Sequence, residues 1–454
     1  MDKHIRCGSL FTSTKDTADK DCTIIVGADG KINFVGPTAS APRPNSGDEL
    51  VDYSGLFVMP GLVDTHTHLA YGEAKSKEDI DIYKPLEFRA IRGMFFAQKV
   101  LAAGYTSICS PGDAGQIALS IRNAIRAGLF DGPRVSAAGP YLTNSQGFQN
   151  TYPTWVGLPS SGIGFMVRNR DEAVLAIREQ CKNGVDAIKL DMDGTQLRPN
   201  GEIIAAFSQT ETTAMVEEVH RQGRYAVAHA YGREAVLYSA RAGVDLIFHA
   251  FYLDDECVDA LVKSGTAIGP TLTMPRNTID FTEATEPAAK KGRIAREMHD
   301  LETGQQNLRK AKAAGVPFVT GTDTGFAVTP YGEWHARELE LFVEYLGCTP
   351  AEAIRASTQN CARFFPQEKI GTLEVGSLAD FIALDASPLE NITVLQNKKH
   401  IKAIHVGGRK VTIEPREYNS RLVSDGAWNS WTNLYTQDYV KRVQGKGLPL
   451  VAAE

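Results

Sequence analysis

The tripeptide His66-Thr67-His68 places two imidazoles two positions apart. On a β-strand, residues two apart point to the same face, so both rings could chelate one metal ion. A metal held by imidazoles can lower the pKa of water far enough for hydrolysis at neutral pH. Two ordinary surface histidines would show the same spacing, so the pair needs a supporting structural context.

Three further candidate ligands supply that context. His229, His249 and Asp323 each stand at the end of a short apolar, strand-like run. The chain has ten histidines, and four of them occupy such positions, which packing alone explains poorly. Imidazole and carboxylate donors suit zinc, with manganese, cobalt or iron as alternatives. The pattern therefore predicts a metal centre where several strands end.

Lys189 lies in another strand-like run, AIKLD (187–191). A lysine amine whose pKa is depressed by nearby metal charge can react with carbon dioxide. The resulting carbamate is an anion whose two oxygens can bridge two ions. A lysine that extends its ammonium group to solvent is the commoner arrangement. The residue pattern alone leaves both alternatives open.

The elements that must position these residues alternate after residue 59. Helical patterns are predicted at 88–103, 117–127, 171–183 and 210–222, and eight strand candidates start near residues 61, 105, 134, 186, 225, 246, 267 and 317. Alternating strands and helices indicate parallel βαβ units. Eight of them predict an α/β fold of the (β/α)8 TIM-barrel type, whose sites lie at the carboxyl ends of the strands. A doubly wound sheet is the alternative, but no G-x-G-x-x-G follows a strand.

Both ends of the chain are rich in short strands. An Asp29-Gly30 turn between two β-rich runs predicts a hairpin at 22–36. Further short β runs follow residue 365. We therefore expect residues 1–59 and 366–415 to form one small β-sandwich domain beside a barrel spanning 60–365.

The segment 416–454 is expected to be a tail that docks on the body or on a partner subunit. Its aromatic content supports docking rather than disorder. The aromatic residues concerned are Trp428, Trp431, Tyr435 and Tyr439.

Composition narrows the class of protein. The net charge of −6 gives no support to nucleic-acid binding. No apolar stretch is long enough to cross a bilayer, and the first residues do not resemble a signal peptide. The seven cysteines are scattered without a Cys-x-x-Cys, so we expect buried, reduced thiols. These features predict a cytoplasmic protein that acts on a small-molecule substrate.

Six motifs, taken in order, resemble the amidohydrolase superfamily over nearly all of the chain. The branch that is most similar holds Xaa-Pro-type dipeptidases, ochratoxinase-like amidases, and the phenylurea and molinate hydrolases. The motifs are MPGLVDTHTHL (59–69), AIKLD (187–191), AHAYG (228–232), FHA (248–250), GTDTG (321–325) and GSLADFIAL (376–384).

This resemblance implies a centre of two divalent metal ions. His66, His68 and Asp323 would hold the more buried ion, and His229 and His249 the other. A carboxylated Lys189 would bridge the two. The ions would share a water and lower its pKa, so that metal-bound hydroxide attacks the substrate.

The resemblance also suggests catalytic roles for two side chains, Asp323 and Tyr231. Asp323 would accept the proton of the attacking hydroxide and pass it to the leaving nitrogen. Tyr231, two residues beyond His229, would donate a hydrogen bond to the developing oxyanion or bind the substrate. A tyrosine that merely packs there is the alternative.

The substrate class follows from what replaces a family loop. Dipeptidase-like relatives carry a Gly-Gly-His-Gly-Asp-like loop whose histidine helps to bind a carboxylate. Here Gln146 and Gly147 match in part, but Phe148 and Gln149 replace the histidine. With aromatic residues nearby, this predicts a small, fairly apolar molecule carrying an amide, urea or carbamate C–N bond, such as a phenylurea, anilide or thiocarbamate. Gln146, Phe148, Tyr231 and Arg233 are the expected substrate-binding residues.

Other functions stay open as alternatives. Arg233 could bind a substrate carboxylate, which favours a dipeptidase or an acyl-amino-acid amidase. A deaminase of the superfamily usually has a glutamate where Gly232 stands and lacks the lysine, and a non-catalytic scaffold would lack ligands that are all present here. His335 is expected to be structural. By analogy with relatives, we expect a homo-oligomer.

Overall fold

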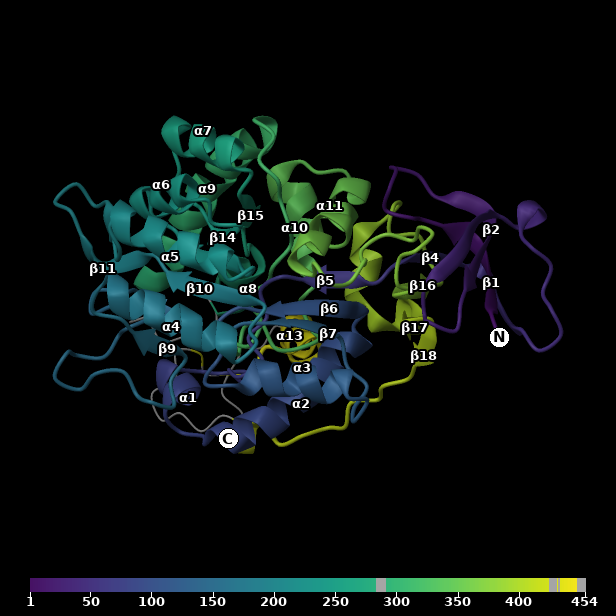
Figure 1. Cartoon of the computed structure of the whole chain (residues 1–454), viewed down its shortest axis with the longest axis horizontal. Coiled ribbons are helices and arrows are strands. Elements are labelled where there is room, and N and C mark those ends of the chain that lie inside the picture. Colours follow the sequence, from purple (N-terminus) through teal and green to yellow (C-terminus); the bar gives the residue numbers. More distant parts are fainter. Residues whose placement is uncertain (283–290, 424–430, 432, 447–454) are drawn as a thin grey trace.

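A parallel β-barrel surrounded by helices occupies most of the chain, and a small β domain lies at one end of it (Figure 1). The computed structural model describes residues 1–282, 291–423, 431 and 433–446. Trp428 lies outside these residues.

The barrel is closed by the eighth predicted strand. Residues 317–324 connect the seventh strand to the first, because the Ile268 amide donates to the Pro317 carbonyl (2.9 Å) and the Thr65 amide to the Thr320 carbonyl (3.0 Å). The TIM barrel predicted from the alternation is thereby confirmed. In order, the other strands are β5 (Leu62–Asp64), β6 (Tyr105–Ser110), β7 (Arg134–Ala137), β10 (Ala187–Asp191), β13 (Tyr225–Ala230), β14 (Leu246–His249) and β15 (Ala267–Gly269).

Helices cover the outside of the barrel. The four predicted helices are present, with boundaries displaced by one or two residues. Side-chain caps set two of the observed starts, because Asn169 accepts from the Glu172 amide and Ser208 forms a capping box with Glu211. The helices are α1 (Lys77–Asp81), α2 (Leu86–Ala102), α3 (Ile117–Arg126), α4 (Arg170–Lys182), α5 (Gln209–Arg221), α6 (Arg233–Ala242), α7 (Asp255–Ser264), α8 (Thr273–Thr282), α9 (Lys291–Ala313), α10 (Arg337–Leu346) and α11 (Pro350–Ala356).

Short strands that the sequence did not predict decorate the loops at the carboxyl ends of the third and fourth barrel strands. β8 (Tyr141–Thr143) pairs with β10 and with β9 (Gly164–Met166). β11 (Asp193–Leu197) and β12 (Ile203–Ala205) form a separate antiparallel pair. These three- to five-residue elements are too short to show a clear period in the sequence.

The two chain ends meet in one seven-stranded sheet, as predicted for the small β domain. Its order is β18-β17-β16-β4-β1-β2-β3, and β2 and β3 form the expected antiparallel hairpin. Its bounds are β1 (Lys3–Leu10), β2 (Asp19–Val26), β3 (Ile32–Pro37), β4 (Glu49–Pro60), β16 (Phe381–Leu384), β17 (Ile401–Val406) and β18 (Arg409–Val411). Arg134 of the barrel joins Asp380 of this domain through two hydrogen bonds of 2.5 and 3.1 Å.

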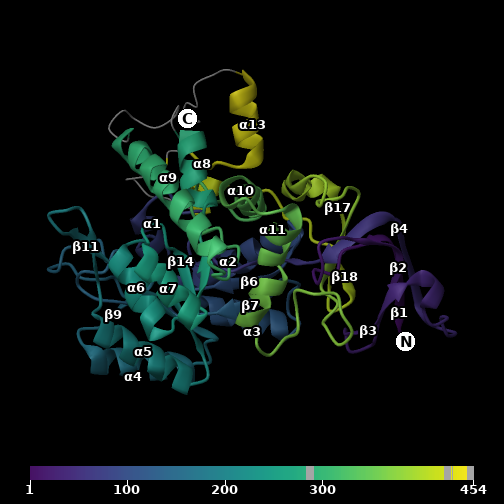
Figure 2. The same cartoon turned by 90° about the horizontal axis from the view of Figure 1, so that it is seen from above.

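After the β domain the chain returns to the barrel. This last segment includes α12 (Ser420–Val423) and α13 (Gln437–Lys446), and α13 lies beside α8 and α10 (Figure 2). Trp431 and Tyr435 are buried in a cluster with Phe281 and Trp334. All seven cysteines are buried free thiols, as expected. None of the helices in the described part of the chain is long and apolar enough to span a membrane.

Candidate metal centre

All six predicted ligands lie at the carboxyl ends of barrel strands. His66 and His68 follow β5, Lys189 lies in β10, His229 in β13, His249 ends β14, and Asp323 follows the last strand. A cavity of about 20 Å³, the size of a water molecule, is lined by all of them except His249. Its lining comprises His66, His68, Lys189, His229, Asp323, Tyr71, Tyr141, Gln149, Asp191 and Phe326.

The ligand atoms form two neighbouring groups. Asp323 Oδ1 lies 3.5 Å from His66 Nε2 and 3.2 Å from His68 Nε2. On the other side, His249 Nε2 lies 3.0 Å from His229 Nδ1. Ligand atoms of His66, His249 and Asp323 all lie within 4.8 Å of one another, so the two groups are continuous.

Burial controls the charge of these groups. It lowers the pKa of His66, His229 and His249 well below the ordinary value, so the imidazoles stay neutral and keep a lone pair for a metal. Burial also lowers the pKa of Lys189 to about 7, against the opposing effect of Asp323. A neutral amine is the form that can be carboxylated.

Neighbouring polar groups orient the rings. The Nδ1–H of His68 donates to the Gly112 carbonyl (3.0 Å), which leaves Nε2 free for a metal. The Thr271 hydroxyl donates to the Pro270 carbonyl (2.6 Å) and therefore accepts from His249 Nδ1. Asp193 Oδ2 lies 3.5 Å from His229 Nε2.

Asp64 links the first and last strands beneath the site, and the sequence reasoning did not single it out. Its carboxylate accepts from the His66 amide (2.9 Å), the Thr322 hydroxyl (2.5 Å) and His335 Nδ1 (2.6 Å). It thereby fixes His66 relative to Asp323, the residue after Thr322. Its place two residues before His66 in the His-x-His motif was the available signal. His335 holds Asp64 and does not line the cavity, which agrees with the expected structural role.

Backbone strain is concentrated at the same rim. His249, Thr271 and Asp323 have φ angles of 77°, 55° and 55°, in the left-handed region that residues with a Cβ seldom adopt. Such strain persists where surrounding contacts enforce it, and it gathers at functional sites. Here it turns each chain segment sharply at the strand end that carries or supports a candidate ligand.

The donor set fits a divalent metal. Lys189 Nζ is a buried polar atom without a hydrogen-bond partner in the described part of the chain. An uncompensated polar atom of this kind is costly, and a group bound at this position would remove part of that cost. Neutral imidazoles and a carboxylate match the ligand preference of zinc and similar ions.

Two of the four expected substrate-binding residues lie at the site. The Tyr231 ring stacks on His249 at 4.2 Å, and burial raises the pKa of its hydroxyl well above the ordinary value. The Phe148 ring stacks on His229 at 5.2 Å with an interplanar angle of 10°, and it is 47% exposed. Phe148 thus covers one candidate ligand with an apolar ring that a substrate can reach.

The other two lie elsewhere. Arg233 begins α6 and pairs with Asp254 and Glu256, each at 2.5 Å. Gln146 is exposed in the loop after β8, whereas Gln149, which the sequence reasoning did not select, lines the cavity. Tyr71, Tyr141 and Phe326 were also missed, since nothing in their local sequence distinguishes them from packing aromatics.

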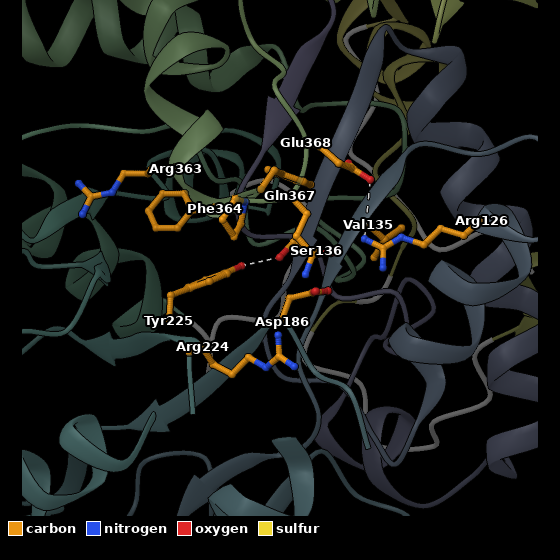
Figure 3. A pocket seen from close by; sticks show the side chains of 13 residues that line it. Arg126, Val135, Ser136, Asp186, Arg224, Tyr225, Arg363, Phe364, Gln367 and Glu368 are labelled. Atoms are coloured by element: carbon orange, nitrogen blue, oxygen red, sulfur yellow. Dashed lines mark hydrogen bonds and ion pairs between the residues drawn. The ribbon is translucent and has the colours of Figure 1, made fainter. Parts of the chain in front are cut away.

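A larger cavity of about 240 Å³ lies at the opposite, amino-terminal ends of β7, β10 and β13 (Figure 3). It is lined by arginine and carboxylate side chains, including Arg126 and Glu368 at 3.7 Å, and by aromatic rings. The Tyr225 hydroxyl there bonds Ser136 at 2.7 Å. It contains none of the six predicted ligands, so the smaller cavity is the candidate site.

Comparisons with known proteins agree with this geometry. A family model described as "Amidohydrolase family" matches residues 57–411. Ochratoxinase from Aspergillus niger is 28% identical over 414 residues, covering 85% of this chain and 82% of that protein.

Solved structures extend the likeness. A Xaa-Pro dipeptidase crystallised with methionine in its active site is 27% identical, with a TM-score of 0.77 over 90% of this chain and 100% of that one. Phenylurea hydrolase B has a TM-score of 0.72 over 90% of this chain and 97% of that one, but at 23% identity it supports the fold alone.

Proposed function

Since the chain belongs to the amidohydrolase family and is a hydrolase acting on C–N bonds, we propose that it cleaves an amide, urea or carbamate bond in a small, fairly apolar molecule. The observation that carries this choice is the Phe148 ring, stacked on His229 and half exposed at the place where dipeptidase-like relatives are expected to carry a histidine. An apolar face next to the reacting centre favours an apolar substituent on the substrate.

The proposal includes two divalent ions, with zinc first among the candidates. His66, His68 and Asp323 would hold one, His229 and His249 the other, and a carboxylated Lys189 would join them. When bound, such ions make water more acidic and polarise a carbonyl oxygen.

The side chains have separate roles in the reaction. The Asp323 carboxylate takes a proton from the attacking water and returns it to the leaving nitrogen, so the amine departs neutral. Its side chain is 13% exposed, which lets substrate and water reach it. Tyr231, whose ring stacks on His249, orients the substrate. Phe148 excludes water from one flank of the site.

An acyl-amino-acid amidase is the second candidate, because ochratoxinase and the Xaa-Pro dipeptidase are more similar in sequence than phenylurea hydrolase B. The position of Arg233 weighs against it. That guanidinium, which could have bound a carboxylate, is already neutralised by two carboxylates of the chain.

A matched pair of substrates separates the two candidates. N-benzoyl-phenylalanine and N-benzoyl-phenethylamine differ only in the carboxylate. We expect kcat/KM for the two to agree within about tenfold in zinc-loaded protein, which corresponds to about 1.4 kcal/mol of discrimination. A preference above about 100-fold for the acid would establish the amino-acid amidase instead. Phenylureas, anilides and thiocarbamates would then define the leaving group, and light scattering would test the expected homo-oligomer.

A further inference from the structure

A series of aromatic contacts connects His68 of the candidate metal centre to Trp431 in the C-terminal segment. Tyr71 stacks on His68 at 4.0 Å, with the rings 4° from parallel. The Tyr71 ring meets Phe326 edge-on at 5.2 Å, and Phe326 contacts Trp431 at 5.5 Å. Both Tyr71 and Phe326 line the site cavity. Trp431 therefore lies directly behind a wall of the site.

The backbone makes the same connection. Two loops form this wall, one after β5 and one after the last strand, and they are bonded to each other through Ala74 and Ala327. The Trp431 amide donates to the Lys75 carbonyl (3.2 Å), and the Tyr435 amide donates to the Ala327 carbonyl (3.0 Å). The C-terminal segment thus holds both loops at once.

The segment is itself anchored on the barrel helices. Trp334 Nε1 donates to the Tyr435 carbonyl at 2.7 Å, and the Tyr435 ring is fully buried. Trp431 is only 4% exposed. We call Trp431, Tyr435 and α13 the C-terminal clamp. The family match ends at residue 411, so the clamp is a feature of this chain beyond the matched region.

We propose that the C-terminal clamp sets the width of the substrate pocket, with Trp431 as the positioning residue that keeps Phe326 turned toward the cavity. This inference rests on the proposed function for its substrate class. Protein interiors are close-packed, so a side chain supported from behind cannot yield to a bulky substrate. Without the indole, the Phe326 ring can move back into the space and widen the pocket on that side.

The test uses two hydroxamates that bind metals without being turned over. Acetohydroxamate and 1-naphthohydroxamate measure the pocket for a small and a bulky acyl group. In zinc-loaded Trp431→Ala we expect the affinity ratio, measured by calorimetry, to shift at least tenfold toward the naphthyl compound. Trp431→Phe should shift it less than threefold, because it keeps an aromatic ring behind Phe326.

Two variants control for effects on folding. Trp334→Phe removes one bond to the clamp without touching the cavity, so a smaller shift in the same direction is expected. Leu422→Ala changes a 65% exposed residue of α12, outside the clamp and the cavity lining, and should leave the ratio unchanged. If Trp431→Ala does not fold, the test rests on the affinity ratio of the two hydroxamates in Trp334→Phe. A shift toward the naphthyl compound supports the clamp, and an unchanged ratio contradicts it.

Hydrogen–deuterium exchange provides a second measurement that needs neither metal nor turnover. Peptides covering residues 70–76 and 323–330 should exchange several-fold faster in Trp431→Ala than in the unaltered protein. An unchanged affinity ratio together with unchanged exchange in folded protein would overturn the clamp. If the unaltered protein hydrolyses none of the amides, ureas or carbamates, the proposed function fails, while the binding and exchange results still decide this inference.

Discussion

The Nζ atom of Lys189 lies 4.0 Å above the centre of the Phe248 ring and has no hydrogen-bond partner among the described residues. Phe248 in turn stacks on His66 at 3.8 Å, so one ring supports both a predicted ligand and the lysine. The amine is held in place by packing, with its reactive atom left free inside the candidate metal centre.

The proposed ligand role of Lys189 can be tested by substitution. Lys189→Met should reduce kcat/KM by more than about 100-fold, because losing the proposed bridging ligand would cost at least as much as losing a group that orients a ligand. Bound metal, measured by elemental analysis, should fall in parallel. Lys182→Met, an exposed change at the end of α4, is the control. In the unaltered protein, reactivation of metal-free enzyme should require bicarbonate; equal recovery without it would contradict carboxylation.

Thr271 should contribute to metal affinity through His249. Thr271→Val keeps the shape but removes the oxygen that accepts from Nδ1, so the ring loses its orientation. We expect zinc to bind about 10–100-fold more weakly, as is typical for groups that orient a ligand. Competition with a chromophoric chelator measures this. Thr271→Ser retains the hydroxyl and should stay within a few-fold of the original; a similar loss in both variants would show that the hydroxyl bond to His249 is not what supports metal affinity.

The sequence predicted the convergence of the candidate ligands better than it predicted the residues around them. His66, His68, His229, His249 and Asp323 stand at recognisable strand ends, so their convergence follows from the barrel alone. Tyr141 and Phe326 reach the cavity only because loops from distant parts of the sequence fold over it. Arg233 is the reverse case, a residue predicted to bind substrate that the structure pairs with Asp254 and Glu256 instead. These partners belong to the next βα loop and helix, so the sequence around Arg233 does not indicate them.

Breaking the link between the barrel and the β domain should destabilise the protein. Asp380 is 3% exposed and pairs with Arg134 in a bidentate geometry. Asp380→Asn should lower the free energy of unfolding by about 3 kcal/mol, at the low end for a broken buried pair because Arg134 keeps Glu368 at 3.6 Å. Urea denaturation measures the change. Asp385→Asn, which disrupts an exposed pair with Lys402, should change the free energy of unfolding far less than Asp380→Asn does.

His405 should make the β domain sensitive to acid. Burial lowers its pKa to about 4, and its ring stacks on Phe381 and bonds the Tyr53 hydroxyl at 2.9 Å. Between pH 6.5 and about 4 the unfolded chain binds a proton that the folded protein does not. The free energy of unfolding should therefore fall by about 3 kcal/mol as pH decreases across this window.

Urea denaturation at several pH values, compared with a His405→Gln variant, isolates this contribution. The variant should lack that part of the pH dependence, while retaining what other groups contribute. Identical slopes for the two proteins between pH 4 and 6.5 would show that His405 titrates normally in the folded state.

The seven-stranded sheet also constrains how the protein is made. β4 emerges from the ribosome early, but β16, which pairs with it along Phe57–Pro60, is translated only after the entire barrel. Until then one edge of β4 stays open to pairing with other nascent chains. The last strands to be translated complete the sheet, and the chain then returns to the barrel.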